Sequence, residues 1–433
     1  MKTALRILTY SSIFIGYLYF MSLHAPLGIT WMDFHAERMF LAVEFLRENG
    51  FSKFGFTIWS HCTDCILETG INEGIYYSSL HAINLSPYSL IYFLGGKESL
   101  LMWGPILDKL VIFLCGVFIS EITAKLISKT SSLHIFLIGT ACFSLFTLSP
   151  WVYKIFLGGW FEIYFALFFL LGVLSFQRNK FRLGLGFFLL ASFSQSIWGS
   201  WLGIFYLLIL IFPFLLKRDD ISNKYFPAKL NTFLKKILVI IVLIFPQIFF
   251  AALKLIADPY VEFGTSSSVF YRMGISGEDI HSGGILGALQ FLGGSRLTQC
   301  FGGEGLGIFS AGNMALISMY NCMFSIFGMV IISFISIIGV YLLVKSSNNA
   351  ARLLLPLIFS MLMFIGVFQQ SLSVHLMGYS FIFAILFAAG ITKLMTLLQD
   401  RVGSSSISII FSIPCLAGIL ILSIRVSMLS SMS

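Results

Sequence analysis

Apolar residues recur along this chain in long runs that are separated by shorter polar segments. Runs of about 20 apolar residues predict helices long enough to cross a lipid bilayer. We expect about eleven such helices, with boundaries that pattern reading places only to within a few residues. They fall near residues 4–23, 101–124, 133–148, 161–176, 183–198, 201–216, 237–256, 315–344, 353–368, 376–391 and 407–424. The pattern therefore predicts an all-α polytopic membrane protein.

The basic residues alternate in step with these runs. Every second connection carries Lys or Arg: Lys2 and Arg6, Lys125 and Lys129, Arg178 to Arg182, Lys217 to Lys236, Lys345 and Arg352, and Lys393 and Arg401. Basic residues collect on the cytoplasmic side of membrane proteins, so we expect a cytoplasmic N-terminus and an integral protein of a bacterial inner membrane. The alternative for residues 1–25 is a cleaved signal peptide, since two basic residues precede an apolar stretch.

Composition agrees with this interpretation. Hydrophobic residues make up 58% of the 433 residues and charged residues 11%, with a mean hydropathy of +0.93. Soluble domains carry about 25% charged residues. The net charge of +8 is explained by orientation and by contact with a lipid bilayer. No basic stretch interleaved with aromatic residues suggests a nucleic-acid partner.

Two of the predicted connections are long. We interpret residues 1–433 as a single transmembrane domain, with large extracytoplasmic loops at residues 24–100 and 257–314. Long connections in a compact chain are usually functional or disordered. Both are rich in aromatic residues and glycine, which favours structured, functional loops.

The first long loop opens with Asp33 and a predicted amphipathic helix from Phe34 to Glu48 that would lie along a membrane interface. Its apolar stripe consists of Met39, Ala42, Val43 and Leu46. Asp33 is suited to cap this helix, because its carboxylate accepts bonds from the free N–H groups of the first turn. The same carboxylate could also remove a proton from a hydroxyl or bind a metal ion, and the two roles are compatible.

This opening resembles that of the GT-C glycosyltransferases. The residues that carry the resemblance are Asp33, His35 and Arg38, followed by Glu44-Phe45-Leu46 and Gly50. These multispanning enzymes take sugars from polyprenyl-phosphate or pyrophosphate carriers, and they include oligosaccharyltransferase catalytic subunits, protein mannosyltransferases and aminoarabinose transferases. The Asp–His and His–Arg spacings differ from the family patterns, and Asp33 lacks an adjacent second acid.

The resemblance implies a GT-C-like helical bundle and assigns roles to particular residues. Asp33 would be the catalytic base or a metal ligand, while His35 and Arg38 would bind substrate. Whether a divalent cation takes part stays open, and no metal site is assigned. The chemistry is consistent, since a sugar on a phosphate already has a good leaving group and the acceptor hydroxyl must lose a proton.

Other polar residues are candidates for the same site. Glu162 would supply a second acid, or else pair with Lys154 or face solvent. Arg272 and Arg296 would bind phosphate, because guanidinium groups match phosphate oxygens, or else pair with nearby acids. His375 and Tyr379 would contact the carrier phosphate or the acceptor.

The cysteines leave several alternatives open. Cys115, Cys142 and Cys415 fall within apolar runs and are expected to be small buried residues. Cys62 and Cys65 could pair with each other, or either could pair with Cys300. Free thiols and half of a zinc site are the alternatives to a disulfide.

The sequence thus favours a glycosyltransferase that moves a sugar from a polyprenyl-linked donor to an extracytoplasmic acceptor. One alternative is a transporter or flippase of a lipid-linked or sugar substrate, although no repeated halves are visible. Another is an enzyme similar to O-antigen ligases or polymerases, in which Asp33 would be dispensable, and a scaffold is a third. The charged pair Asp108 and Lys109 is expected near the end of a run.

Overall fold

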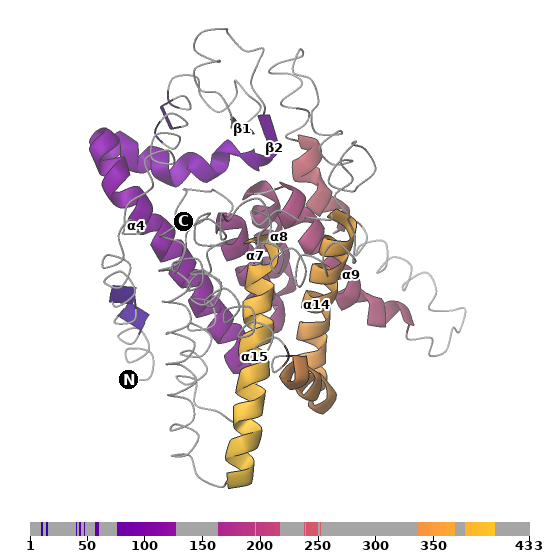
Figure 1. Ribbon diagram of the computed structural model, residues 1–433. Coiled ribbons are helices and arrows are strands. Elements are labelled where there is room, and N and C mark those ends of the chain that lie inside the picture. Colours follow the sequence, from indigo (N-terminus) through magenta and orange to yellow (C-terminus); the bar gives the residue numbers. More distant parts are fainter. Residues whose placement is uncertain are drawn as a thin grey trace, which may run out of the picture.

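The computed structural model describes a discontinuous set of residues (Figure 1). They are residues 10–11, 14–15, 40, 43–44, 47, 57–59, 76–126, 163–194, 196–216, 238, 240–249, 252, 334, 337–368 and 377–402. Their elements are β1 (Thr57–Trp59), β2 (Tyr76–His81), the 3-10 helix η1 (Ala82–Leu85), α4 (Ser86–Leu126), α7 (Ile163–Gln177), α8 (Phe181–Ser194), α9 (Ser196–Leu216), α14 (Asn348–Phe368) and α15 (Met377–Val402). The predicted runs at 133–148 and 407–424 lie outside this set.

The predicted bundle of about eleven membrane-spanning helices was wrong. Across the described ranges, no helix combines the length and the apolar character needed to cross a bilayer. Helices α7 and α8 have 15 and 14 residues, fewer than the ~20 that a span requires. Helix α4 is longer, but it is interrupted at Gly95 and Gly96 and carries Asp108 and Lys109 in its interior. This finding also removes the basis for the GT-C-like membrane bundle and for the inner-membrane localisation.

Within residues 24–100, predicted as a large structured loop, the structure describes two strands and the beginning of a long helix. Strands β1 and β2 pair antiparallel, with Thr57 opposite His81 and Trp59 opposite Tyr76, and the register shifts after Thr57. Helix α4 then begins at Ser86, well before the expected start at residue 101. β-Branched and aromatic residues such as those of β1 favour strands, and this local signal was overlooked beside the long apolar runs.

Helix α4 consists of two limbs. Residues 86–94 form the first limb and residues 97–126 the second, and Gly95 and Gly96 between them have non-helical backbone angles. Gly96 has a φ of 69°, a left-handed conformation that glycine adopts without steric cost. The first limb crosses over the top of the other helices in Figure 1, and the second runs down beside them.

Helices α7 and α8 form an antiparallel pair joined by a tight turn. Asn179 takes a left-handed φ of 58°, and the Lys180 N–H donates to the Ser175 carbonyl at 2.9 Å. This closes the end of α7 in the way that a left-handed residue commonly ends a helix. Helix α9 follows almost directly and approaches α8 so closely that a Cβ on Gly199 would lie 2.2 Å from the Ala191 carbonyl oxygen.

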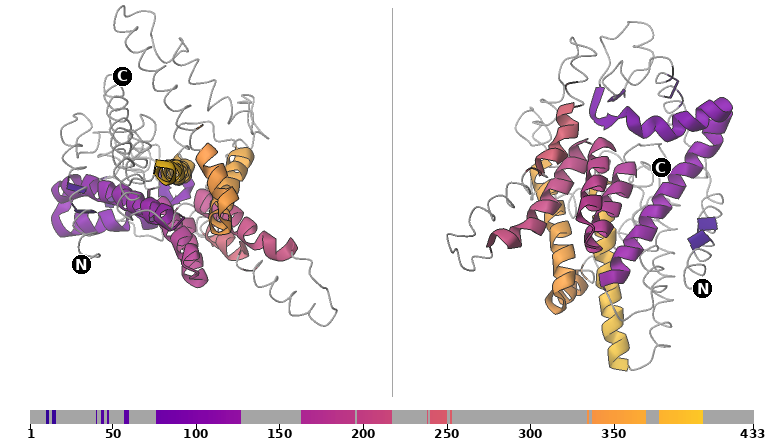
Figure 2. Two further views of the ribbon diagram at one scale, coloured as in Figure 1. Left: turned by 90° about the horizontal axis from the view of Figure 1, so that it is seen from below. Right: turned by 180° about the vertical axis from the view of Figure 1, so that it is seen from behind.

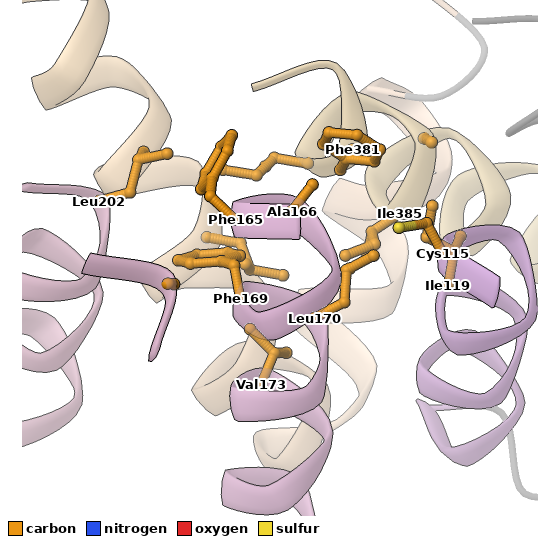
Figure 3. Packing of buried hydrophobic residues seen from close by; sticks show 14 of the residues in the cluster. Cys115, Ile119, Phe165, Ala166, Phe169, Leu170, Val173, Leu202, Phe381 and Ile385 are labelled. Carbon is orange, nitrogen blue, oxygen red and sulfur yellow. The ribbon is translucent and has the colours of Figure 1, made fainter. Parts of the chain in front are cut away.

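The core forms where α4, α7, α9 and α15 meet. Figure 3 shows Phe165, Phe169 and Leu170 of α7 between Leu202 of α9 and the side chains of α4 and α15. The side chains of α4 and α15 at this place include Cys115, Ile119 and Ile385. Cys115 is fully buried, which confirms the prediction that it is a small buried residue. Seen from below, α15 lies between α4 and α14 (Figure 2).

An aromatic core fills the centre of the α7–α8–α9 group. It consists of Phe169, Phe176, Phe188 and Tyr206. The rings of Phe169 and Phe188 stack with centroids 5.0 Å apart, and Tyr206 meets Phe188 edge-on at 5.4 Å. Such aromatic pairs add to the free energy gained from burying the rings.

Candidate functional site

A polar cluster is buried where the two limbs of α4 meet the beginning of α7. Its members are Tyr88 of the first limb, Asp108 and Lys109 of the second limb, and Tyr164 of α7; they are 0%, 2%, 1% and 8% exposed, respectively. Ionisable groups are rarely buried this deeply without a partner or a function. We refer to these four residues as the polar cluster.

The central contact joins the two limbs of α4. The Tyr88 hydroxyl donates a hydrogen bond to the Asp108 carboxylate, across the break at Gly95 and Gly96. A hydrogen bond to a charged group is stronger than one between neutral groups. The bond therefore fixes the first limb against the second, between residues on either side of the break at Gly95 and Gly96.

Tyr164 approaches this pair from α7. Its ring meets the Tyr88 ring edge-on, with centroids 6.2 Å apart and planes at 80°. The Tyr164 hydroxyl is buried and lies near enough to the Tyr88 hydroxyl for Tyr88 to affect the pKa of Tyr164. It nevertheless makes no hydrogen bond with good geometry. A buried hydroxyl without a partner costs about 1–3 kcal/mol, so this arrangement calls for a reason.

Burial controls the ionisation of the cluster. It raises the pKa of Tyr88 well above the usual value, and the negative charge of Asp108 raises it further. Burial likewise raises the pKa of Tyr164. For Lys109, burial lowers the pKa to about 8, while Asp108 opposes the shift. At neutral pH the tyrosines are therefore neutral donors, and the positive charge of Lys109 is held only weakly.

The first limb also contacts the helix predicted to follow Asp33. Residues 40, 43, 44 and 47 are helical, and Val43 is fully buried. The Phe40 ring lies 5.8 Å from the Tyr92 ring, and the Lys97 ammonium lies 4.4 Å from the Phe40 ring centroid. The Arg47 guanidinium lies 5.7 Å from the Tyr92 ring centroid. The structure thus supports the predicted helix at these positions and places it against α4.

Most of the residues predicted to form the site lie outside the described residues. These are Asp33, His35, Arg38, Glu162, Arg272, Arg296 and His375, and the same holds for Cys62, Cys65 and Cys300. Tyr379 belongs to the first turn of α15. Glu162 directly precedes the first residue of α7, the helix that contributes Tyr164. Among the described residues, no group of three acidic, His or Cys side chains could hold a metal ion.

Sequence reasoning missed the polar cluster. The pair Asp108–Lys109 was expected near the end of an apolar run, but it lies in the middle of α4 and is buried. The signal was present, since two adjacent opposite charges inside an apolar run are costly unless they face partners. What the pattern did not contain was the earlier start of α4, which brings Tyr88 to Asp108.

Comparison with known proteins adds no assignment. No family model, no curated protein and no solved structure matches the chain.

Proposed function

We propose that this protein is a glycosyltransferase that moves a sugar from a polyprenyl-phosphate or pyrophosphate carrier to an acceptor hydroxyl. The resemblance at residues 33–50 to enzymes of that activity supports the proposal. Asp33 acts as the base that takes the acceptor proton, and Glu162 assists. Arg272 and Arg296 neutralise the departing phosphate, and His35, Arg38, His375 and Tyr379 bind substrate. The mechanism requires no metal ion.

One structural observation carries the proposal beyond the resemblance. The helical residues that follow Asp33 pack on the first limb of α4, through Phe40 and Tyr92. That limb contributes Tyr88 to the polar cluster, and α7, which begins directly after Glu162, contributes Tyr164. The helix that follows Asp33 thus packs on the limb that carries Tyr88, and the helix that follows Glu162 carries Tyr164. Both helices are therefore connected to the polar cluster.

Tyrosine and carboxylate side chains suit a reaction of sugars. A carboxylate accepts hydrogen bonds from sugar hydroxyls, and a neutral phenol both donates and accepts. The raised pKa of Tyr88 and of Tyr164 keeps both phenols protonated at neutral pH, so each retains its donor. These properties support the proposed sugar substrate.

The experiment that tests the proposal compares Asp33→Asn with the wild-type chain. Purified full-length protein is given farnesyl phosphate linked to radiolabelled glucose, mannose or arabinose together with an alkyl glycoside as the hydroxyl acceptor, and the radiolabelled glycoside formed from that acceptor is measured. Loss of a general base lowers such rates about 10²- to 10⁴-fold. The matched control is Glu37→Gln, which removes a charge from the same predicted helix and should leave transfer unchanged.

Two outcomes would reject the proposal. The first is the absence of any transfer by the wild-type chain with all three donors. The second is full transfer by a folded Asp33→Asn variant. If that variant is active while Arg272→Ala and His375→Ala are not, the ligase-like or polymerase-like alternative replaces the present assignment.

A further inference from the structure

We infer that Tyr88, Asp108 and Tyr164 form a closed binding subsite for a sugar hydroxyl, which the first limb of α4 covers and uncovers by turning at Gly95 and Gly96. The inference rests on the proposed function for the identity of the ligand. It adds a site to that function, because none of these three residues belongs to the set predicted to carry the reaction.

The first step concerns Tyr164. Its hydroxyl is buried without a hydrogen-bond partner, and the residue is 8% exposed. Folded proteins pair the large majority of buried polar atoms, so an orphaned hydroxyl marks either a destabilising defect or a place that a ligand completes. Its position beside a buried carboxylate and a second phenol favours the ligand.

The second step concerns the chemistry of that position. The Asp108 carboxylate is an acceptor with two oxygens, and in the closed state it accepts a hydrogen bond from the Tyr88 hydroxyl. A sugar hydroxyl can donate to the same carboxylate and accept from the Tyr164 phenol. A phosphate suits the place poorly, because the carboxylate would repel it and the buried Lys109 of the same cluster holds its proton weakly.

The third step concerns access. The first limb carries Tyr88 on its inner side, but Leu90, Phe93 and Leu94 are 59%, 81% and 76% exposed. The contacts described for the limb are on its inner side: the Tyr88–Asp108 bond, the packing of Ile91 and Tyr92 against the core, and the contacts of Tyr92 with Phe40 and Arg47. Gly95 and Gly96 provide a hinge with little resistance to backbone rotation.

The opening step is tested by hydrogen exchange on the full chain without any ligand. We expect amides of residues 86–94 to exchange at least about tenfold faster than those of α7, since they open without global unfolding. Tyr88→Phe should accelerate exchange in the limb further, whereas Tyr206→Phe should leave the limb unchanged. Exchange in the limb as slow as in α7 would overturn the moving cover.

The binding step is tested with Tyr164→Phe and the matched control Tyr206→Phe, which removes a phenol buried in the aromatic core. With the farnesyl-phosphate sugars, Tyr164→Phe should raise KM about three- to tenfold with little change in kcat, because one hydrogen bond to substrate is lost. Its thermal stability should stay equal or rise, since no partner is left behind. Tyr206→Phe should change neither kinetic constant.

The outcomes separate this inference from the proposed function. Unchanged KM in Tyr164→Phe, with active wild-type protein, rejects the subsite and leaves the transferase intact. A loss of thermal stability with unchanged KM gives Tyr164 a structural role and also rejects the subsite. If wild-type protein transfers nothing, the transferase is rejected, and binding of the same compounds decides the subsite: weaker binding to Tyr164→Phe supports it, and equal binding or none overturns it.

Discussion

Two buried tyrosines of this molecule have opposite surroundings. Tyr206 lies among the rings of Phe169, Phe176 and Phe188, whereas Tyr164 lies against Tyr88 beside the Asp108 carboxylate. Burial raises the pKa of both phenols. Around Tyr206 the surrounding rings provide close packing. Around Tyr164 polar groups are gathered at a cost in desolvation, which a purely structural role does not require.

The two tyrosines belong to regions of the fold that we expect to contribute differently to stability and to function. The aromatic core joins α7, α8 and α9 through close ring contacts and through glycines that admit them, as at Gly172, where a Cβ would meet the Phe188 ring at 2.4 Å. The polar cluster joins the two limbs of α4 through the Tyr88–Asp108 hydrogen bond, and it meets α7 through the ring contact between Tyr88 and Tyr164. Substitutions should therefore affect folding most in the first region and ligand-dependent properties most in the second.

The largest effect is expected from Phe188→Ala in the aromatic core. Phe188 is fully buried and contacts three other rings of that core, so its removal leaves a cavity. The free energy of unfolding should fall by about 3–5 kcal/mol in denaturant titration. Phe181→Ala is the control, because Phe181 is 40% exposed and its loss should cost under about 1 kcal/mol. A similar small loss for Phe188→Ala would show that the core is not where stability resides.

The next effect is a pH dependence caused by Lys109. Its folded pKa of about 8 lies below the unfolded value of 10.5, so the native state releases its proton first as pH rises. The unfolded state then binds more protons at this site, so Lys109 by itself should contribute a gain in stability of about 2 kcal/mol between pH 8 and 10. Burial raises the pKa of Cys115 and of the tyrosines Tyr88, Tyr164 and Tyr206, and these groups oppose the gain because they keep protons that the unfolded chain releases. The contribution of Lys109 is therefore measured as a difference between the wild-type chain and a variant without the amine.

The variant Lys109→Met measures the contribution of the Lys109 amine to the pH dependence of stability. The variant should be more stable than the wild-type chain at pH 7, because an apolar side chain of similar length has no charge to desolvate, and this advantage should shrink by about 2 kcal/mol between pH 8 and 10 as Lys109 of the wild-type chain loses its proton. Lys97→Met, at an exposed position of α4, should keep the wild-type pH profile. Identical profiles for Lys109→Met and wild type would mean that the amine is solvated, and the polar cluster would then not be closed.

A smaller effect is expected from Asp108→Asn. The amide keeps an acceptor for Tyr88 but loses the charge, so the free energy of unfolding should fall by about 1–2 kcal/mol at pH 7. Glu121→Gln provides the control, because Glu121 accepts a comparable bond from Tyr10 at 2.8 Å in a partly buried position. The free energy of unfolding of the control should fall by less than about 0.5 kcal/mol. Equal losses for the two variants would mean that burial does not make the Asp108 carboxylate more important for stability than the partly buried Glu121.

The sequence predicted several helices closely, and the reasons are physical. The expected helix at 161–176 corresponds to α7, and the one at 201–216 to α9, which begins earlier at Ser196; both are continuous apolar runs that end at basic residues, Arg178 and Lys217. The pattern could not reveal that α4 starts at Ser86, since Tyr88 and Ser89 interrupt the apolar run. It also led to a membrane-spanning interpretation that the described helices do not support.

The site was less predictable than the helices. Asp33 was predicted from its position before a helix and from the resemblance of residues 33–50 to the GT-C openings, and Arg272 from the match of guanidinium to phosphate oxygens; both residues lie outside the described residues. The polar cluster depends on a contact between residues 20 positions apart on either side of a helix break. Hydrophobic periodicity carries no information about such a contact, because it records which residues are apolar and not which polar residues meet.

The smallest expected effect is also the sharpest test of the comparison. A double-mutant cycle between Tyr88→Phe and Asp108→Asn should give a coupling of about 1 kcal/mol, because each substitution weakens the same hydrogen bond. The cycle between Tyr164→Phe and Asp108→Asn should give under about 0.5 kcal/mol, since the Tyr164 hydroxyl has no bond to lose in the unliganded protein. Denaturant titrations of six proteins without ligand, namely the wild type, the three single variants and the two double variants, measure both couplings. Equal couplings would mean that Tyr164 already shares the carboxylate with Tyr88, and its hydroxyl would then be satisfied within the fold, as structural hydroxyls are, with no need of a ligand.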